Sequence, residues 1–192
     1  MSPPGEPSGA GGDVAWRCFI AVGLVDPARS AVAEYLAHLR ATVPEVSWAR
    51  PEQLHLTLKF LGNVSPSRLP ALEARLTDAL RAFGADALDV GGVGAFPSLA
   101  RPQVVWVGVR APSLSALADA VETSCVAEGF APEPRTFRPH VTLGRVRERG
   151  RRATPLALLV RDGDRAFGTS QLREVALFRS VLGGGGARHS VL

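Results

Sequence analysis

The feature that most constrains this chain is a short strand-like pattern that it contains twice. The stretch "LHLTLKF" (54–60) carries His55 and Thr57, and "PHVTLGR" (139–145) carries His140 and Thr142. In both copies a His, an aliphatic residue, a Thr and another aliphatic residue follow one another. Each copy comes after a strand-like stretch and an amphipathic helical stretch, so strand, helix and strand occur twice. This repeat predicts an α+β fold with two antiparallel-sheet lobes related by a pseudo-two-fold axis.

Apolar periodicity divides the rest of the chain into alternating elements. Runs rich in β-branched and aromatic residues predict strands, and apolar residues spaced three or four apart predict helices. The pair 86–96 and 103–109 is expected to be antiparallel. The predicted strands are 16–24, the region of Trp48 with 54–61, 86–96, 103–109, 136–146 and 172–182. The predicted helices are 27–39, 65–83 and 112–130, with a short helix or loop at 154–162.

Strand geometry divides each copy of the motif between two faces, because alternate side chains of a strand share a face. The residues expected on the polar faces are His55, Thr57 and Lys59 in the first copy and Arg138, His140 and Thr142 in the second. The residues expected to face the core are Leu56, Leu58, Phe60, Val141 and Leu143. A pseudo-two-fold axis would make the two polar faces meet across a groove.

Two imidazoles that face one another can act as general acid and general base near neutral pH, where both protonation states of His are populated. Thr hydroxyls are suitable donors for phosphate oxygens. One His on a strand is more often structural, but the chain has only four His, so chance repetition of the whole pattern is improbable. We therefore interpret His55 and His140 as catalytic. His38 and His189 lack the pattern, and we interpret them as structural or exposed.

A metal site would require three or four ligands. Neither motif His has another His, Cys, Asp or Glu two or four positions away, so we expect neither a metal nor another cofactor. Cys18 and Cys125 are far apart and form no CxxC pair, so neither a disulfide framework nor a zinc ribbon is indicated. This cysteine usage is typical of a reducing compartment, and we expect a cytoplasmic protein.

Length and composition indicate one folding unit. The 192 residues suffice for one domain, which we expect at 14–192, after a disordered Gly- and Pro-rich tail at 1–13. No apolar run approaches the roughly 20 residues of a membrane helix. The net charge of +4 and pI near 10.0 favour anionic partners such as nucleic acid or nucleotides. We expect a soluble monomer without a membrane partner.

At these motifs the chain resembles the two-histidine (2H) phosphoesterase superfamily, and within it the RNA 2′,3′-cyclic phosphodiesterases, long labelled 2′-5′ RNA ligases. The resemblance covers nearly all of the chain after the tail. It rests on "RCFIAVGL", "WARPEQLHLTLKFLGNV", "VGAFPSLARPQVVWVGV", "FRPHVTLGRV" and "LFRSVLGGGGARHSVL". The closing segment departs from the family, because His189 stands where an aromatic residue such as Tyr is expected.

The resemblance implies a bilobal fold with helices on the outside and a positively lined cleft. It implies metal-free opening of a terminal 2′,3′-cyclic phosphate to a 2′-phosphate. His55 would protonate the departing 3′ oxygen, His140 would activate water, and Thr57 and Thr142 would hold the phosphate.

Three basic residues are further candidates for binding the phosphate. Arg145 matches a basic residue of the family's second motif. Strict alternation places it on the face opposite His140, so this role requires a β-bulge. Arg138 and Lys59 are candidates on face geometry alone, with a solvated cation as the alternative.

Several alternatives remain open at the level of sequence. Ligation uses the same chemistry with an RNA 5′-hydroxyl in place of water. The substrate could be an RNA end, a small cyclic nucleotide or an ADP-ribose cyclic phosphate, because nothing in the sequence sets the length of the groove. A non-catalytic RNA-end binding module is a third reading, and the presence of both imidazoles argues against it.

Overall fold

The structure, a computed structural model, describes residues 14–44, 46–147, 156–183 and 186–192. Within them, nine strands form one antiparallel sheet in the order β7-β4-β5-β6-β3-β1-β8-β9, with β2 beside β6. The strands are β1 Trp16–Gly23, β2 Val46–Trp48, β3 His55–Val64, β4 Asp86–Phe96, β5 Val104–Arg110, β6 His140–Val146, β7 Ala166–Leu172, β8 Ala176–Gly183 and β9 Gly186–Val191. The helices are α1 Ala28–Thr42, α2 Leu69–Leu80, α3 Leu114–Ala127 and α4 Leu156–Arg161, with 3₁₀ turns η1 Pro51–Gln53 and η2 Pro66–Arg68.

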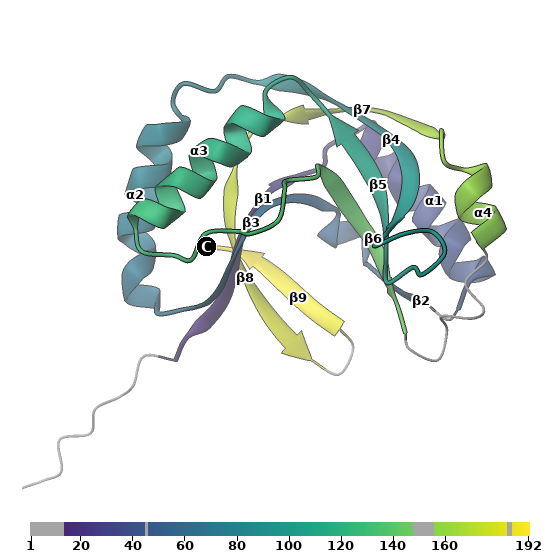
Figure 1. Cartoon of the computed structure of the whole chain (residues 1–192), viewed down its shortest axis with the longest axis horizontal. Coiled ribbons are helices and arrows are strands. Elements are labelled where there is room, and N and C mark those ends of the chain that lie inside the picture. Colours follow the sequence, from purple (N-terminus) through teal and green to yellow (C-terminus); the bar gives the residue numbers. More distant parts are fainter. Residues whose placement is uncertain (1–13, 45, 148–155, 184–185) are drawn as a thin grey trace, which may run out of the picture.

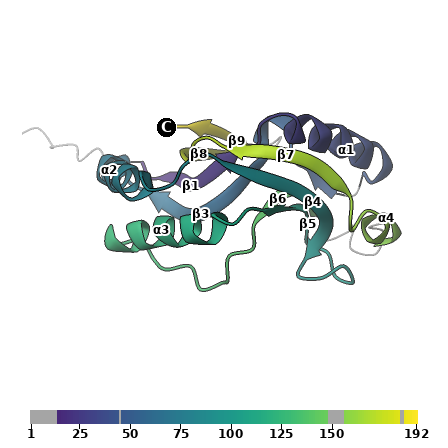
Figure 2. The same cartoon turned by 90° about the horizontal axis from the view of Figure 1, so that it is seen from above.

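The sheet consists of two halves that meet where β3 pairs with β6. One half is β3-β1-β8-β9 and carries α2 and α3, and the other is β6-β5-β4-β7 and carries α1 and α4. Figure 1 shows the two helix pairs at opposite ends of an arched sheet, and Figure 2 shows the same arrangement from above, with α2 and α3 at one end and α1 and α4 at the other. The predicted α+β bilobal architecture is confirmed, and the two lobes share one continuous sheet.

Two hydrophobic clusters lie beneath the helices, and the first also takes in residues of β1, β3 and α3. In one half, Leu36 and Leu39 of α1 are fully buried in the cluster that contains Val107 of β5. In the other half, Leu72 of α2 and Val121 of α3 are fully buried in a second cluster. Full burial of such a side chain contributes about 1.5–3 kcal/mol. The helices therefore hold one face of each half, and the opposite face remains open for the motif residues.

The predicted elements differ from the structure mainly near the C-terminus. The strand expected at 172–182 is present as β8 but starts later, because Leu172 ends β7 and β8 begins at Ala176. Two further strands, β7 and β9, were not predicted, since their sequences are rich in Gly, Ser and Thr and lack a continuous apolar face. β6 begins at His140 and not at residue 136. The expected tail, 1–13, lies outside the described residues.

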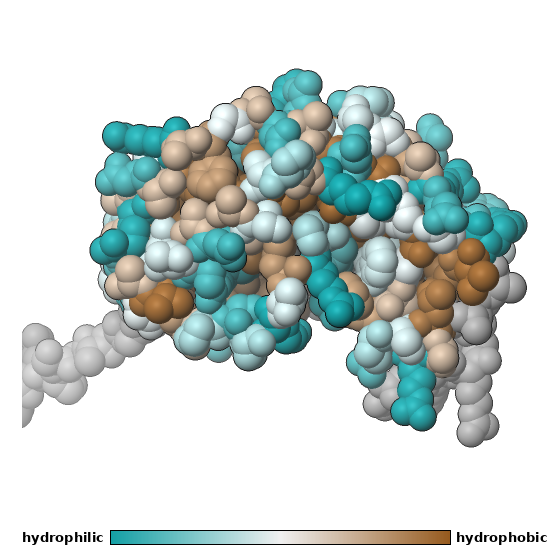
Figure 3. Space-filling view, turned by 45° about the horizontal axis from the view of Figure 1, so that its top comes forward, coloured by the Kyte–Doolittle hydropathy of each residue, from teal (hydrophilic) through white to brown (hydrophobic). Residues whose placement is uncertain are grey.

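The outer surface is mixed in character. On the face shown in Figure 3, hydrophilic and hydrophobic side chains are interspersed, and the hydrophobic ones gather where α4 lies. There Val160 is 59% exposed. Among the described residues, no helix is long and apolar enough to cross a membrane.

Candidate active site

One pair of residues at the centre of the sheet brings the two motifs together. Leu56 of β3 is paired with Val141 of β6, and both side chains are fully buried. In an antiparallel pair, the residues on either side of such a position point to the other face. The four residues that flank the pair are His55, Thr57, His140 and Thr142. The central pairing therefore places both motifs next to one another on the helix-free face of the sheet, which we call the site face.

A bulge in β3 changes the face of the residues after Thr57. Thr57 and Lys59 pair with consecutive residues of β1, so Leu58 is an extra residue between them. Lys59 consequently points beneath α3, where it is 4% exposed and its ammonium lies 2.7 Å from the Glu122 carboxylate. The prediction that Lys59 shares a face with His55 is therefore wrong. Its charge is balanced by a partly buried ion pair on the opposite side of the sheet.

The same bulge returns Phe60 to the site face. Phe60 was predicted to face the core, but it pairs with Phe19 of β1, and the two rings lie 6.1 Å apart. Phe60 is 52% exposed. The prediction of a core position is wrong because it assumed unbroken alternation across Leu58.

An equivalent bulge in β6 places Arg145 on the site face. Thr142 and Gly144 pair with consecutive residues of β5, so Leu143 is the extra residue. Arg145 then follows on the same face as His140 and Thr142, and its side chain is exposed. The positive charge of Arg145 lowers the pKa of His140. The bulge that a role for Arg145 requires is therefore present.

The matching bulges make Phe60 and Arg145 equivalent positions of the two halves. Each lies five residues after its motif His, and each is on the site face. One half of the site thus presents an aromatic ring where the other presents a guanidinium. The two halves can consequently bind chemically different parts of one ligand.

His140 is held by the chain segment just before it. Its Nδ1 lies 2.6 Å from the Arg138 carbonyl oxygen. A carbonyl can only accept a hydrogen bond, so Nδ1 carries the proton and Nε2 of the neutral ring is an acceptor. The ring also packs edge-to-face on Phe96, at 4.9 Å between centroids. Burial lowers the pKa of His140 most strongly, and the Arg138 carbonyl opposes this effect.

Arg138 lies on the same side as His140. Its guanidinium carbon is 6.0 Å from the centre of the Phe96 ring, the ring against which His140 packs. The Arg138 side chain is exposed. The expected proximity of Arg138 to His140 is therefore present in the structure.

His55 occupies a more enclosed position. The Phe19 ring stacks on it at 4.9 Å, and the Phe178 ring lies at 5.9 Å. A hydrogen bond to the Gln53 backbone favours its protonated form, but burial and nearby imidazoles outweigh this bond and lower the pKa of His55 to about 4. Gln53 precedes His55 by two residues, as Arg138 precedes His140. Backbone carbonyls at matching positions thus orient both rings.

A third imidazole, that of His189, lies beside His55. Their ring centroids are 5.5 Å apart and nearly perpendicular, and His189 is also 4.9 Å from Phe19. His189 is only partly exposed. The sequence interpretation, which gave His189 no part in the site, missed this contact because β9 was not recognised as a strand. The departure from the family at this position was the available signal. His38, by contrast, is exposed on α1.

Trp106 forms the wall next to Thr142. It is the β5 partner of Thr142, and its ring lies over Gly94 of β4. A Cβ atom at Gly94 would lie 2.3 Å from the indole, so only glycine allows this close approach. The Trp106 ring also contacts Phe96 at 5.2 Å. Sequence reasoning had assigned neither aromatic residue to the site.

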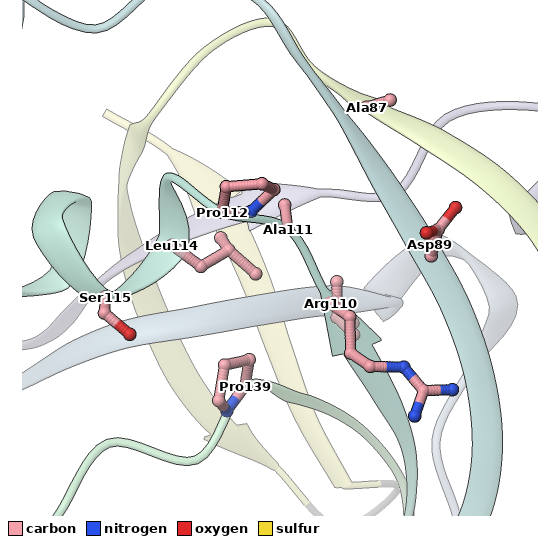
Figure 4. A pocket seen from close by; sticks show the side chains of 9 residues that line it. Ala87, Asp89, Arg110, Ala111, Pro112, Leu114, Ser115 and Pro139 are labelled. Carbon is pink, nitrogen blue, oxygen red and sulfur yellow. The ribbon is translucent and has the colours of Figure 1, made fainter.

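A pocket of about 400 Å³ lies next to the residue that precedes His140 (Figure 4). It includes Pro139, the residue before His140, and Arg110, which is two residues beyond the β5 partner of His140. Figure 4 shows Arg110 and Asp89 on the side formed by β4 and β5. The pocket therefore adjoins the start of the second His-x-Thr motif at Pro139.

The arrangement has the parts needed for acid–base chemistry on a phosphate ester. Two imidazoles lie on one face, with two hydroxyls and a guanidinium beside them. No hydrogen bond joins the Thr57 or Thr142 hydroxyl to another described residue, so both are available to a ligand. Among the described residues, no group of three or more His, Cys, Asp or Glu side chains could hold a metal ion. Cys18 and Cys125 are buried free thiols in the cluster beneath α2 and α3.

Comparisons with known proteins agree with this geometry. The chain is 34% identical over 167 residues to an RNA 2′,3′-cyclic phosphodiesterase of Methanothermobacter thermautotrophicus, covering 86% of this chain and 90% of that one. It is 36% identical over 168 residues to an RNA 2′,3′-cyclic phosphodiesterase of Archaeoglobus fulgidus, covering 86% and 92%.

Solved structures give the same result. A Thermus thermophilus protein superposes with a TM-score of 0.76 at 29% identity, covering 92% of this chain and 94% of that one. Escherichia coli LigT complexed with 3′-AMP superposes with a TM-score of 0.72 at 29% identity, covering 93% and 95%. The family model described as LigT-like phosphoesterase matches twice, at residues 22–106 and 107–188. With its duplicated motif and its two-lobed sheet, the chain belongs to the LigT-like phosphoesterases of the 2H superfamily.

Proposed function

We propose that this protein hydrolyses the terminal 2′,3′-cyclic phosphate of RNA to a 2′-phosphomonoester, without a metal. The observation that carries the proposal is the central pairing of β3 with β6, which places both His-x-Thr motifs on one face. The names of the relatives, RNA 2′,3′-cyclic phosphodiesterases, support the same substrate.

The reaction needs one proton acceptor and one proton donor on opposite sides of the phosphorus. Attacking and leaving oxygens are roughly in line in phosphoryl transfer, and the two motif histidines come from opposite halves of the sheet. Nε2 of His140 accepts a proton from water as the new P–O bond forms. The bond between phosphorus and the 3′ oxygen breaks, and His55 donates a proton to that oxygen. The product has a 2′-phosphate and a free 3′-hydroxyl.

The developing negative charge is stabilised by side chains. The hydroxyls of Thr57 and Thr142 donate to the non-bridging oxygens, and the guanidinium of Arg145 supplies a fixed positive charge. Arg138 adds a second guanidinium at the same end of the site. Lys59 has no part in this step, because its ammonium is already paired with Glu122 beneath α3.

Two features support an RNA end as the substrate in preference to a small cyclic nucleotide. The exposed ring of Phe60 offers a stacking surface for a base. Arg110, in the pocket next to Pro139, forms no ion pair with another described residue and can meet the phosphate of a further nucleotide. Replacing Arg110 with Gln should therefore raise KM for an oligonucleotide and leave KM for a cyclic mononucleotide unchanged.

The proposal is tested with end-labelled RNA that bears a 2′,3′-cyclic phosphate, incubated with purified protein and EDTA. We expect conversion to the 2′-phosphate, identified against synthetic 2′- and 3′-phosphate standards. Adding an RNA with a 5′-hydroxyl to the same reaction measures ligation, the second use of these residues. Activity that EDTA abolishes and zinc or manganese restores would contradict the mechanism. A 3′-phosphate product would contradict the assigned leaving oxygen.

A further inference from the structure

A third imidazole on the site face is not used by the proposed reaction. Among the described strands β9 pairs with β8 alone, and this pairing places His189 opposite Ser180, which in turn pairs with Arg17 of β1. These three residues form a row across the site face, beside the rings that enclose His55. We propose that His189 is a positioning residue of the site, which acts through His55 by controlling its orientation and its protonation.

The first argument is contact. The His189 ring lies 5.5 Å from His55 at an interplanar angle of 88°, and 4.9 Å from Phe19 at 82°. Phe19 in turn stacks on the His55 ring at 4.9 Å between centroids. His55 is thus confined by rings from several strands. The side chain of Gln53 also donates a hydrogen bond to the Ala187 carbonyl, which fastens β9 to the turn that leads into His55.

The second argument concerns the nitrogens of His189. Its Nδ1 is buried and has no hydrogen-bond partner among the described residues. A proton on this atom would be a buried, unsatisfied donor, which costs about 1–3 kcal/mol. The neutral ring with its proton on Nε2 avoids that cost. Burial and the nearby Arg17 lower the pKa of His189 in the same direction. His189 is therefore an uncharged imidazole near neutral pH.

The third argument is the balance of charge around His55. The titratable neighbours of His55 are His189 of β9 and His140 of β6. Strands β1 and β8 contribute only the uncharged rings of Phe19 and Phe178. Only the Gln53 backbone hydrogen bond favours a proton on His55. Two imidazoles at this separation repel one another when both are protonated. Burial disfavours a proton on His55 most strongly, and His189 adds to this effect once it is itself protonated in acid. His189 therefore makes the two motif histidines unequal.

The test uses NMR titration of the substrate-free protein. The four histidine signals are assigned from single substitutions, and the pKa of His55 is followed in the wild type, in His189→Gln and in His189→Phe. Both variants remove a titrating group, and Phe retains a ring for packing. We expect the pKa of His55 to rise from about 4 by about one unit in both, with the pKa of His140 unchanged. His38→Gln, which removes an exposed imidazole from α1, should leave the pKa of His55 as in the wild type.

A kinetic measurement completes the test and rests on the proposed function. One limb of the pH profile of kcat/KM reports the titration of His55. A higher pKa of His55 moves this limb toward higher pH, whichever proton transfer His55 performs. We expect this shift in both His189 variants. If the pKa of His55 is unchanged in a folded variant, the proposal is overturned. A shifted pKa in a protein that does not hydrolyse cyclic phosphates would leave the role of His189 intact and refute the proposed function instead.

Discussion

The enclosed position of His55 predicts a specific loss of stability in acid. The perturbation is His55→Phe, which keeps a ring against Phe19 and Phe178 and removes the titrating group. In the folded wild type the pKa of His55 is about 4, whereas an unfolded chain binds this proton near pH 6.5. The unfolded state therefore binds more protons between these values, so the free energy of unfolding falls as pH falls through this window.

The size of the effect follows from the shift. Each pH unit within the window changes the free energy of unfolding by about 1.4 kcal/mol, so lowering the pH from 7 to 5 removes about 2 kcal/mol. The His55 ring is not wholly shielded from solvent, and screening reduces the expected loss to about 1–2 kcal/mol. His55→Phe should lack this component, while the contributions of carboxylates and of the other histidines remain in both proteins.

The assay is urea unfolding at pH 7, 6 and 5, followed by tryptophan fluorescence. The buffers must be free of phosphate, because an anion bound at the site would favour the protonated ring. We expect the wild type to lose about 1–2 kcal/mol more than His55→Phe between pH 7 and 5. The control His38→Gln should behave as the wild type. Equal pH dependence of the wild type and His55→Phe would refute the reasoning.

The remaining predictions concern the catalytic pair and the basic residues. Replacing His55 or His140 with Ala should lower the single-turnover rate by about 10²- to 10⁴-fold and leave the circular dichroism spectrum unchanged. Wild-type turnover in either folded variant would exclude the acid–base assignment. Because the pKa values of both histidines are lowered, kcat/KM should follow a bell centred below neutrality, and a rate that climbs through pH 9 would point to hydroxide as nucleophile. Arg145→Gln should lower kcat by about 10²-fold and raise the pKa of His140, and an unchanged kcat would remove Arg145 from the site. Lys59→Met leaves Glu122 without its partner, so the free energy of unfolding in urea should fall by about 3 kcal/mol. The folded variant should turn over substrate normally. A stable but inactive variant would place Lys59 in the reaction.

The sequence alone was sufficient for the parts of the site that depend on local pattern. Period-two alternation placed His55 and Thr57 on one face and His140 and Thr142 on another, because successive side chains of a strand point to opposite faces. Repetition of the motif indicated two related halves, and the family resemblance indicated the chemistry. These inferences use residues close together in the chain, so local geometry decides them.

Tertiary structure decided what happens beyond each Thr. A bulge inserts one residue into a strand relative to its partner, and nothing in the single strand reveals the partner's register. Leu58 and Leu143 look like ordinary strand residues in the sequence, yet pairing with β1 and β5 leaves each of them as the extra residue. For this reason Lys59 points to the core side and Arg145 points to the site face.

The position of the closing strand was also decided by tertiary structure. β9 is an edge strand rich in small and polar residues, and its place beside β8 comes from long-range pairing, not from an apolar pattern of its own. His189 therefore had no local feature that marked it as a neighbour of His55. The ring contacts that lower the pKa of His55 join residues far apart in the chain. The sequence determined which groups could carry out the chemistry, and the folded sheet determined which of them meet, because proximity across strands depends on register and not on local pattern.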